Sequence, residues 1–315
     1  MLLDNFIFSV NSVAPVFLLL VLGFLISRKG VLDRPTIGKL NWMVFNMALP
    51  VMLCRDIAES EFTEMFDKNL IFFAVGASIF TCLMALLLSR VIKERPTRGA
   101  FIQGCFRGNY AIVGLPIAAN ILGPNDTGKA ALITTFIIPL YNILAILVLQ
   151  AHGNGKAKAT IKSTLKGIVT NPLIIGICIG LAASAAKLSP PPFISQTMDY
   201  LGGLASPLAL LAIGASIDGG ETRRKLKPAL LASAFKLAFV PILLVPIAAL
   251  LGFRGESMVV LYVMLAAPTA VSSYIMAENM GNDGALAANI VMLTMSASTF
   301  TFTIGIFLVK TAGLF

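Results

Sequence analysis

Charge is scarce in this chain, and its scarcity excludes an ordinary soluble domain. Of 315 residues only 12% are charged, while 57% are hydrophobic. A soluble domain has roughly a quarter of its residues charged. Apolar runs of about 20 residues recur along the whole length, and each is long enough to cross a hydrocarbon core of about 30 Å. We therefore expect an all-α polytopic membrane protein.

Metal ligands and nucleotide-binding motifs are also scarce. The single histidine, His152, falls at a helix end, and four cysteines are scattered through apolar segments. A zinc site needs a cluster of such ligands, and free cysteine packs as a small hydrophobic residue. The glycine-rich loop that binds ATP phosphates is missing as well. We expect no cofactor, no directly ATP-driven pump and no nucleic-acid partner. An intramembrane enzyme is disfavoured too, because it would need paired aspartates or a serine with a mid-membrane histidine.

Ten apolar segments account for most of the sequence. The first is followed by Arg28 and Lys29 instead of being preceded by basic residues, so it is read as a retained span and not as a cleaved signal peptide. The predicted spans are 6–27, 37–54, 69–89, 98–122, 130–151, 166–186, 195–217, 228–252, 257–280 and 285–309.

The distribution of Lys and Arg predicts the orientation. The loops after the odd-numbered spans carry 16 of the 24 basic residues, the opposite side carries six, and Arg107 and Lys236 lie inside spans. By the positive-inside rule the odd-numbered loops are cytoplasmic, so both termini face outward. The net charge of +9 is then mainly a topology signal. A multi-pass location in the cell's inner, or plasma, membrane is expected.

The chain resembles two copies of one unit. Gly123 aligns with Gly281 at an offset of 158, which also pairs Val113 with Val271; Pro50 and Pro207 differ by 157. Each half has five spans, an odd number, so the halves would cross the membrane in opposite senses, as in many secondary transporters. We expect one repeat over 1–152, a cytoplasmic linker over 153–165 and a second repeat over 166–315.

Two spans contain helix-breaking residues at matching repeat positions. The first has Gly114 and Pro116, and the second has Pro268. Proline removes a backbone donor and glycine loosens the helix, and backbone groups freed in this way bind solutes in transporters. A simple proline kink is the alternative. We expect the two broken helices, four and nine, to cross at a substrate site near the middle of the membrane.

Three motifs resemble the auxin efflux carrier family, in the right order and across the whole chain. They are 109–116, 206–216 and 268–278. The resemblance implies a ten-helix fold related to sodium/proton antiporters and bile-acid symporters. In it, helices 1, 2, 6 and 7 form a scaffold, and helices 3–5 and 8–10 form a transport domain. Plant PIN-type members export auxin, and bacterial relatives include malonate and malate permeases. The short linker of this chain resembles the bacterial branch.

The resemblance also points to site residues. An asparagine seven residues before the proline of helix four binds the substrate carboxylate in the plant carriers, and Asn109 has that spacing. Ser273 stands where the plant motif has a second proline, so the contacts of the second half differ. Ser272 and Ser273 are either hydroxyl donors to a carboxylate or bonded to their own helix. Tyr141 and Asn142 are candidates for the cavity or for interhelical hydrogen bonds.

Two cations lie deep in predicted spans. Arg107 and Lys236 are each about nine residues into a helix, roughly 13 Å at 1.5 Å per residue. A cation at that depth costs at least about 2.5 kcal/mol, so each needs a partner or a water path. Arg107 either attracts an organic anion or has a structural partner. Lys236 is a candidate to replace the charge of a coupling ion.

The lack of carboxylates in the middle of the predicted spans limits which coupling ions the protein could use. Spans three to five and eight to ten have no mid-span Asp or Glu, and Glu278 and Asp218 fall near cytoplasmic ends. Cation exchange is therefore disfavoured, and a proton coupled through Glu278, Asp218 or the substrate is retained. The sequence predicts a secondary or facilitative carrier for a small organic anion that works by alternating access. A sodium-coupled bile-acid-type symporter is the alternative, a membrane receptor or sensor is less favoured, and a homodimer through the scaffold helices is a further expectation.

Overall fold

The computed structural model describes residues 18–58, 67–122, 128–153, 170, 172–188, 190–215 and 223–315. Within these ranges every regular element is a helix. Five helical segments are long and apolar enough to cross a membrane, and four shorter apolar helices accompany them. The polytopic helical class is therefore confirmed. The five long segments are Arg34–Arg55, Lys68–Val91, Pro192–Ala215, Leu226–Leu250 and Gly284–Thr311.

The helices follow the predicted apolar segments in chain order. The first described helix is Leu18–Arg28. It is followed by α2 (Arg34–Met43), the π-helical turn η1 (Val44–Ala48), α3 (Leu49–Ala58), α4 (Lys68–Leu88), the short 3₁₀ turn η2 (Ser89–Val91), α5 (Arg95–Phe106), the π-helical turn η3 (Tyr110–Gly114), α6 (Leu115–Leu122) and α7 (Gly128–His152). The second half has α9 (Pro172–Ala185), α10 (Pro192–Gly203), α11 (Ala205–Ala215), α13 (Leu226–Ala234), the π-helical turn η4 (Phe235–Phe239), α14 (Val240–Leu250), α15 (Gly255–Ala266), α16 (Ser272–Asn279) and α17 (Gly284–Thr311).

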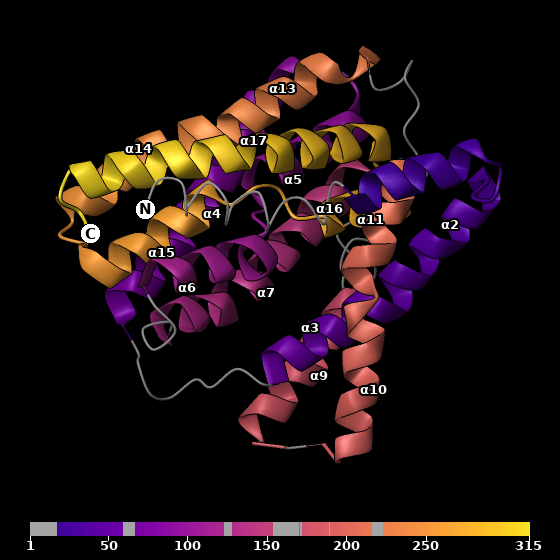
Figure 1. Ribbon diagram of the computed structural model, residues 1–315, viewed down its shortest axis with the longest axis horizontal. Helices are drawn as coiled ribbons and strands as arrows, with labels where there is room; N and C mark the ends of the chain where they lie inside the picture. The colour runs from indigo at the N-terminus through magenta and orange to yellow at the C-terminus, as the bar shows by residue number, and fades with distance from the viewer. Residues whose placement is uncertain are drawn as a thin grey trace.

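Figure 1 shows two groups of helices packed side by side. One group contains α2, α3, α9, α10 and α11, with α3 packed mainly on α9 and α10. The other contains α4–α7 and α13–α17, in which α5 packs on α4, α7 and α17. The short helix α16 belongs to the second group and also contacts α2, η1 and α11 of the first. It therefore lies where the two groups meet.

Glycines bring helices of the first group close to one another and to the Leu18–Arg28 helix. A Cβ atom on Gly176 of α9 would lie 2.4 Å from the Pro50 carbonyl oxygen of α3. Gly23 and Gly214 make reciprocal contacts, because a Cβ on Gly214 would lie 2.0 Å from the Leu20 carbonyl oxygen and one on Gly23 would approach Leu211. Small residues that let helix backbones touch are the usual means of packing helices in membranes.

An ionic cluster joins the starts of three helices in the second group. Lys225, just before α13, contacts the carboxylates of Asp283 at 2.7 Å and Glu94 at 3.2 Å. Thr97 of α5 donates to Asp283 at 2.8 Å. Hydrogen bonds from Thr97 and Lys225 lower the pKa of Glu94. Burial is the largest single effect on Asp283 and Lys225 and opposes their ionisation. The hydrogen bonds and charges of their partners together outweigh it, so the pKa of Asp283 is lowered and that of Lys225 is raised.

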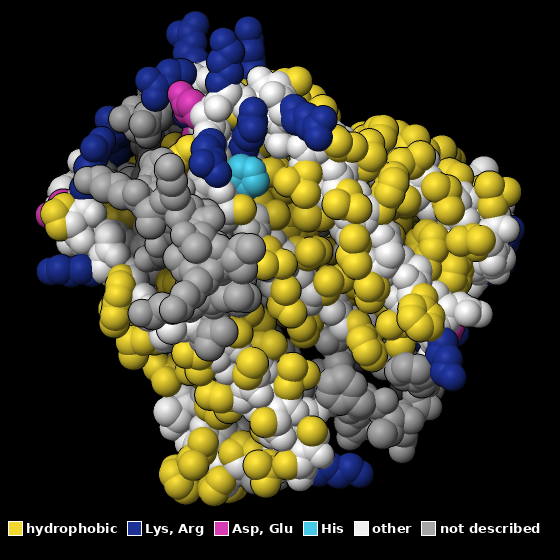
Figure 2. Space-filling view, turned by 180° about the vertical axis from the view of Figure 1, so that it is seen from behind, with side chains coloured by type: hydrophobic (Ala, Val, Ile, Leu, Met, Phe, Trp, Pro, Cys, Tyr) yellow, Lys and Arg dark blue, Asp and Glu magenta, His cyan; other side chains and the backbone are white. Residues whose placement is uncertain are grey.

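The surface divides into a basic end and an apolar body. Figure 2 shows Lys and Arg side chains gathered at one end of the molecule around the single histidine, with hydrophobic side chains covering much of the visible face below them. Exposed aromatic and aliphatic residues such as Phe72, Ile242 and Leu250 are typical of a surface in contact with lipid. The positive-inside rule uses such an excess of Lys and Arg at one end to orient a membrane protein.

Candidate functional site

Two helices of the second group are interrupted. α5 ends at Phe106, the chain is not helical over 107–109, and η3 and α6 then continue. α15 ends at Ala266, and α16 starts at Ser272 after a second interruption. Ala267 has an extended backbone (φ −56°, ψ 135°), the conformation that the residue before a proline prefers.

The two interruptions pair with each other. The Asn109 N–H donates to the Pro268 carbonyl at 2.6 Å, and the Ala270 N–H donates to the Arg107 carbonyl at 3.1 Å. Gly108 and Thr269 thereby form one antiparallel bridge. We name residues 107–109 and 267–271 the crossing. The paired backbone groups satisfy donors and acceptors that a helix break would otherwise leave free.

Gly114 and Pro116 predict an interruption in the first span. The residues that are not helical, 107–109, lie before this motif in the chain. Pro116 is the second residue of α6, where its missing N–H would normally have bonded one turn earlier. The preceding turn widens to a π-helix instead, with the Gly114 N–H bonded to the Asn109 carbonyl at 3.3 Å. A Cβ on Gly114 would lie 2.6 Å from the Tyr110 ring. The motif therefore shapes η3, and the crossing bonds hold the open residues.

Buried polar side chains fix the crossing in place. Thr269 is fully buried; its hydroxyl donates to the Gly104 carbonyl at 2.7 Å, and its N–H donates to the Thr294 hydroxyl at 3.1 Å. Arg107 donates to the Asn142 side-chain oxygen at 2.7 Å and also contacts the Met276 sulfur.

Gln103 is a further residue of this network. With its amide oriented so that the oxygen faces Arg107, it accepts from the guanidinium at 3.1 Å and donates to the Ser273 carbonyl at 3.1 Å. Gln103 was not among the residues predicted from the sequence. It is polar and lies one helical turn before Arg107, and that signal could have identified it.

A cavity of about 80 Å³ lies beside the crossing. It exceeds the roughly 10–15 Å³ that one water molecule needs. α3 and α11 of the first group contribute to its wall, so it lies between the two groups of helices. The lining residues are Leu49, Met52, Leu53, Arg107, Gly108, Asn109, Tyr110, Ile138, Tyr141, Asn142, Ala205, Ala270, Val271 and Ser272.

Asn109 is the polar residue of this cavity that is left unsatisfied. It is only 5% exposed, and its side-chain nitrogen has no hydrogen-bond partner among the described residues. A buried donor without a partner costs about 1–3 kcal/mol, so it indicates a group that binds there. The helix that starts at Tyr110 and the one that starts at Ser272 both lack a side-chain cap. At η3 these first N–H groups favour an anion. At α16 the Ser273 and Tyr274 N–H groups already donate to the Ala270 and Val271 carbonyls, at 2.9 and 3.2 Å.

Five of the predicted site residues come together at this cavity, namely Arg107, Asn109, Tyr141, Asn142 and Ser272. Others lie outside its lining. The Ser273 hydroxyl is buried without a partner among the described residues. The Lys236 ammonium donates to the Leu265 carbonyl at 3.1 Å. Pro268 contributes its carbonyl to the crossing, and Gly114 and Pro116 shape η3 and α6.

The two predicted coupling carboxylates are not at the crossing in the described structure. Glu278 is exposed near the end of α16, where it approaches Gly284. Asp218 lies outside the described residues.

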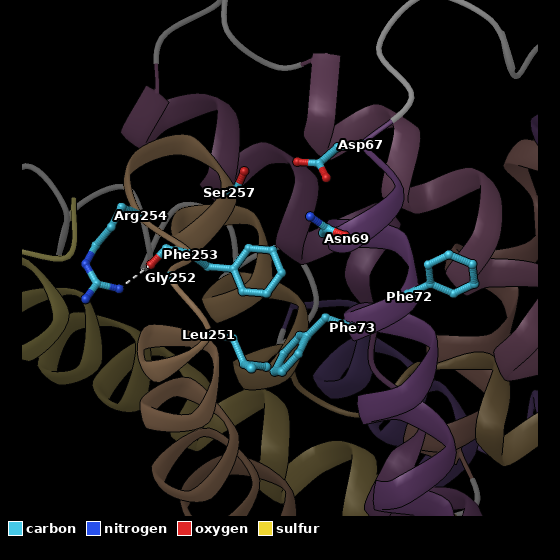
Figure 3. A pocket seen from close by; sticks show the side chains of 9 residues that line it. All are labelled: Asp67, Asn69, Phe72, Phe73, Leu251, Gly252, Phe253, Arg254 and Ser257. Atoms are coloured by element: carbon cyan, nitrogen blue, oxygen red, sulfur yellow. Dashed lines mark hydrogen bonds between the residues drawn. The ribbon is translucent and has the colours of Figure 1, made fainter.

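A larger hollow of about 670 Å³ lies elsewhere, between the start of α4 and the connection from α14 to α15. In Figure 3 the Phe73 and Phe253 rings meet at its centre, with Asp67, Asn69 and Ser257 above them. Its charged groups already have partners, because Asp67 caps α4 through the Leu70 N–H and Arg254 donates to the Phe253 carbonyl. We therefore place the candidate site at the crossing.

Comparison with known proteins now identifies the family. A family model described as membrane transport protein matches residues 8–306. The chain belongs to the membrane transport protein family, which includes the auxin efflux carriers. The resemblance stated from the sequence motifs is thereby confirmed.

Individual relatives of this family match nearly the full length. One is a protein of Rhizobium meliloti named "Putative malonate transporter", 25% identical over 310 residues that cover 96% of each chain. An uncharacterized transporter of Methanothermobacter thermautotrophicus is 23% identical over 86% of this chain and 89% of its own. Another from Methanocaldococcus jannaschii is 23% identical over 90% and 93%. The family and these names indicate a membrane transporter and not an enzyme.

Proposed function

We propose that this member of the membrane transport protein family is a secondary or facilitative carrier for a small organic anion, a mono- or dicarboxylate. The observation that carries the proposal is the unsatisfied, buried Asn109 amide in a cavity at the crossing of two interrupted helices. A carboxylate oxygen would accept from that nitrogen, and a charged acceptor makes a stronger hydrogen bond than a neutral one.

The surroundings of Asn109 suit a negative charge. The Arg107 guanidinium lines the same cavity, and the uncapped start of η3 adds the positive end of a helix dipole. The Ser272 hydroxyl and the Tyr141 ring complete the wall. Such a site binds an anion through donors that are already in place, which reduces the ordering that binding requires.

We infer alternating access from the position of the cavity. It lies between two packed groups of helices, with α3 and α11 on one side and the crossing and α7 on the other. In our proposal the group of α2, α3, α9, α10 and α11 is the scaffold. The group of α4–α7 and α13–α17 is the transport domain, which carries the crossing past the scaffold.

Matching helix lengths support an inverted repeat of ten spans. α5 and α15 each have 12 residues before their interruptions. After the interruptions, η3 and α6 continue the first helix and α16 continues the second. Helices of equal length ahead of the two breaks are expected if the halves derive from one unit. We propose that both termini face outward across the plasma membrane, with the basic end of Figure 2 in the cytoplasm.

Uptake into liposomes that contain the purified protein tests this function. The panel is labelled mono- and dicarboxylates under imposed proton, sodium or voltage gradients, and it includes malonate because a relative is named for it. We expect saturable uptake of at least one carboxylate. Asn109→Ala should raise the half-saturation concentration about 10- to 100-fold, the equivalent of one charge-assisted hydrogen bond. Sodium flux without any carboxylate flux would exclude the proposal.

A further inference from the structure

We propose that Asn41, Tyr274 and Asn279 form a gate that closes the cytoplasmic side of the site in this conformation. The inference rests on the proposed alternating access and names the contact that must break in each cycle. The Asn41 side-chain nitrogen donates to the Tyr274 hydroxyl at 3.2 Å, and the Asn279 side-chain nitrogen donates to the Asn41 carbonyl at 3.3 Å. Asn41 belongs to α2 and the other two belong to α16. These hydrogen bonds therefore join the proposed scaffold to the proposed transport domain.

The gate lies between the crossing and the basic end of the molecule. α16 begins at Ser272, which lines the cavity, and ends at Asn279. Shortly after this end, a Cβ atom on Gly99 would meet both Asn282 and His152. Figure 2 shows the histidine among the Lys and Arg side chains of the basic end. α16 therefore runs from the site toward the end that we place in the cytoplasm.

The cavity lies at a different level of the same scaffold helix. Arg34–Arg55 is one continuous helical segment through α2, η1 and α3. Asn41 lies before η1, whereas the cavity wall comes from Leu49, Met52 and Leu53 after it. From Asn41 to Leu49 the chain advances eight residues, roughly 12 Å at 1.5 Å per residue. The gate and the cavity thus follow one another along the helix, with the gate nearer to the basic end.

The main contacts between the two groups of helices are on the gate's side of the crossing. α16 packs on α2, η1 and α11 of the first group. α5 starts near the basic end, where Thr97 binds Asp283, so α6 leads away from that end. α6 packs on α7, α15 and η3 of its own group. The described structure is therefore closed toward the basic end.

The gate is buried but its hydrogen bonds are weak enough to break during transport. Asn41 and Tyr274 are 3% and 2% exposed. Both hydrogen bonds join neutral groups, which contribute less than charge-assisted ones. The Asn41 side-chain oxygen has no partner among the described residues, and such an acceptor favours opening to water. Because Ser272 and Tyr274 share the first turn of α16, a movement of this short helix changes the site and the gate together.

The test measures from which side of the membrane Ser272→Cys is alkylated, in a variant whose four native cysteines are replaced. A membrane-impermeant maleimide is added to right-side-out and to inside-out vesicles. The test variant is Tyr274→Phe, which removes only the hydroxyl. The matched control is Tyr262→Phe, because the buried Tyr262 hydroxyl donates to the Thr301 carbonyl within the second group.

For Tyr274→Phe we expect alkylation from the cytoplasmic side to become about 2- to 10-fold faster. That is the shift in an equilibrium that the loss of one neutral hydrogen bond gives. Tyr262→Phe should react like its parent from both sides. A cytoplasmic rate for Tyr274→Phe that is no higher than that for Tyr262→Phe would overturn the gate.

Cross-linking gives a second test that does not depend on the folding of Tyr274→Phe. In the protein without native cysteines, Asn41→Cys and Asn279→Cys together should be joined by a short, cleavable reagent that reacts with two thiols. Uptake of a transported carboxylate should then be lost and should return on cleavage. Each single variant, treated with the same reagent, is the control. Failure of the pair to cross-link, or wild-type uptake by the cross-linked protein, would contradict the gate.

The outcomes separate this inference from the function on which it rests. Wild-type protein that moves no carboxylate would remove the proposed substrate class. The alkylation rates need no substrate, so they would still decide whether Asn41, Tyr274 and Asn279 close the cytoplasmic side.

Discussion

At the scale of single residues, the crossing combines satisfied and unsatisfied polar groups. Arg107 and Thr269 have side-chain or main-chain partners, whereas the Asn109 side-chain nitrogen has none among the described residues. Satisfied buried groups define one geometry, and an unsatisfied one costs free energy until something binds to it. The satisfied groups therefore hold the site rigid, and the unsatisfied Asn109 nitrogen binds the ligand.

Gln103→Leu should weaken both the fold and transport. It leaves an Arg107 nitrogen and the Ser273 carbonyl without their partner, so we expect the free energy of unfolding to fall by about 1–3 kcal/mol. The half-saturation concentration for the anion should rise because Arg107 loses its orientation. Thermal unfolding in detergent and liposome uptake measure the two effects. The control is Gln196→Leu on the exposed face of α10, and equal behaviour of the two variants would contradict this role of Gln103.

The sequence predicted part of the site at this scale. Arg107, Asn109 and Ser272 could be identified because charge, amide and hydroxyl groups are conspicuous in apolar spans. The contacts within the site could not be predicted. Gln103 and Ser273, for example, are 170 positions apart and meet only because the two interruptions pair in one register. The same limit applies to Lys236, whose partner Leu265 lies on another helix.

At the scale of helices, proline and glycine predicted that two spans are interrupted, and the structure has both interruptions. Their position was less predictable. In the first span the open residues precede the Gly114–Pro116 motif, because they pair with Pro268 and Ala270 of the other break. A local sequence rule has no information about a partner some 160 residues away.

Close packing of α3 on α9 gives a prediction for glycine. Gly176→Ala would place a methyl group 2.4 Å from the Pro50 carbonyl oxygen, so the helices must separate. We expect a loss of about 1–3 kcal/mol in the free energy of unfolding, the usual cost of overpacking. Gly203→Ala in α10 is the control, because its Cβ would meet nothing within 4 Å. A Gly176→Ala protein as stable as Gly203→Ala would contradict the packing.

The cluster around Lys225 predicts a pH dependence of stability. Lys225→Met should lower the free energy of unfolding by about 1–2 kcal/mol near pH 7, between the values for exposed and buried pairs. The carboxylates of Asp283 and Glu94 have lowered pKa values, so their contribution is present above their unfolded pKa values, about 3.8 and 4.5. It is lost as the pH falls through the folded values.

Thermal unfolding of wild type and Lys225→Met between pH 7 and pH 3 measures this contribution. The difference should shrink below about pH 4. Because the pKa of Lys225 is raised, the difference should persist on the alkaline side until the pH passes its usual value of 10.5. A difference that stays constant down to pH 3 would show that the ion pairs do not contribute.

At the scale of the whole molecule, the sequence predicted the class and family, and the structure adds where the two groups of helices meet. The cavity at that boundary joins a basic crossing to an apolar wall from α3 and α11.

Exchange should be faster than net transport, because the empty carrier moves the buried Arg107 charge without a bound anion beside it. Vesicles preloaded with a transported dicarboxylate should take up the labelled compound several-fold faster than empty vesicles do. Initial rates with and without internal substrate measure the ratio. Equal rates would mean that the empty carrier returns as readily as the loaded one.

The central claim is that the anion binds at the crossing of the two interrupted helices. Its most direct test is protection of a cysteine placed in the cavity, Ser272→Cys, in a variant whose four native cysteines are replaced. The control is Ser257→Cys, whose position lines the larger hollow and not the crossing. We predict that a transported anion slows alkylation at position 272, with half-protection at its half-saturation concentration for uptake, and leaves position 257 unaffected. An alkylation rate at position 272 that does not change with saturating anion would contradict the account.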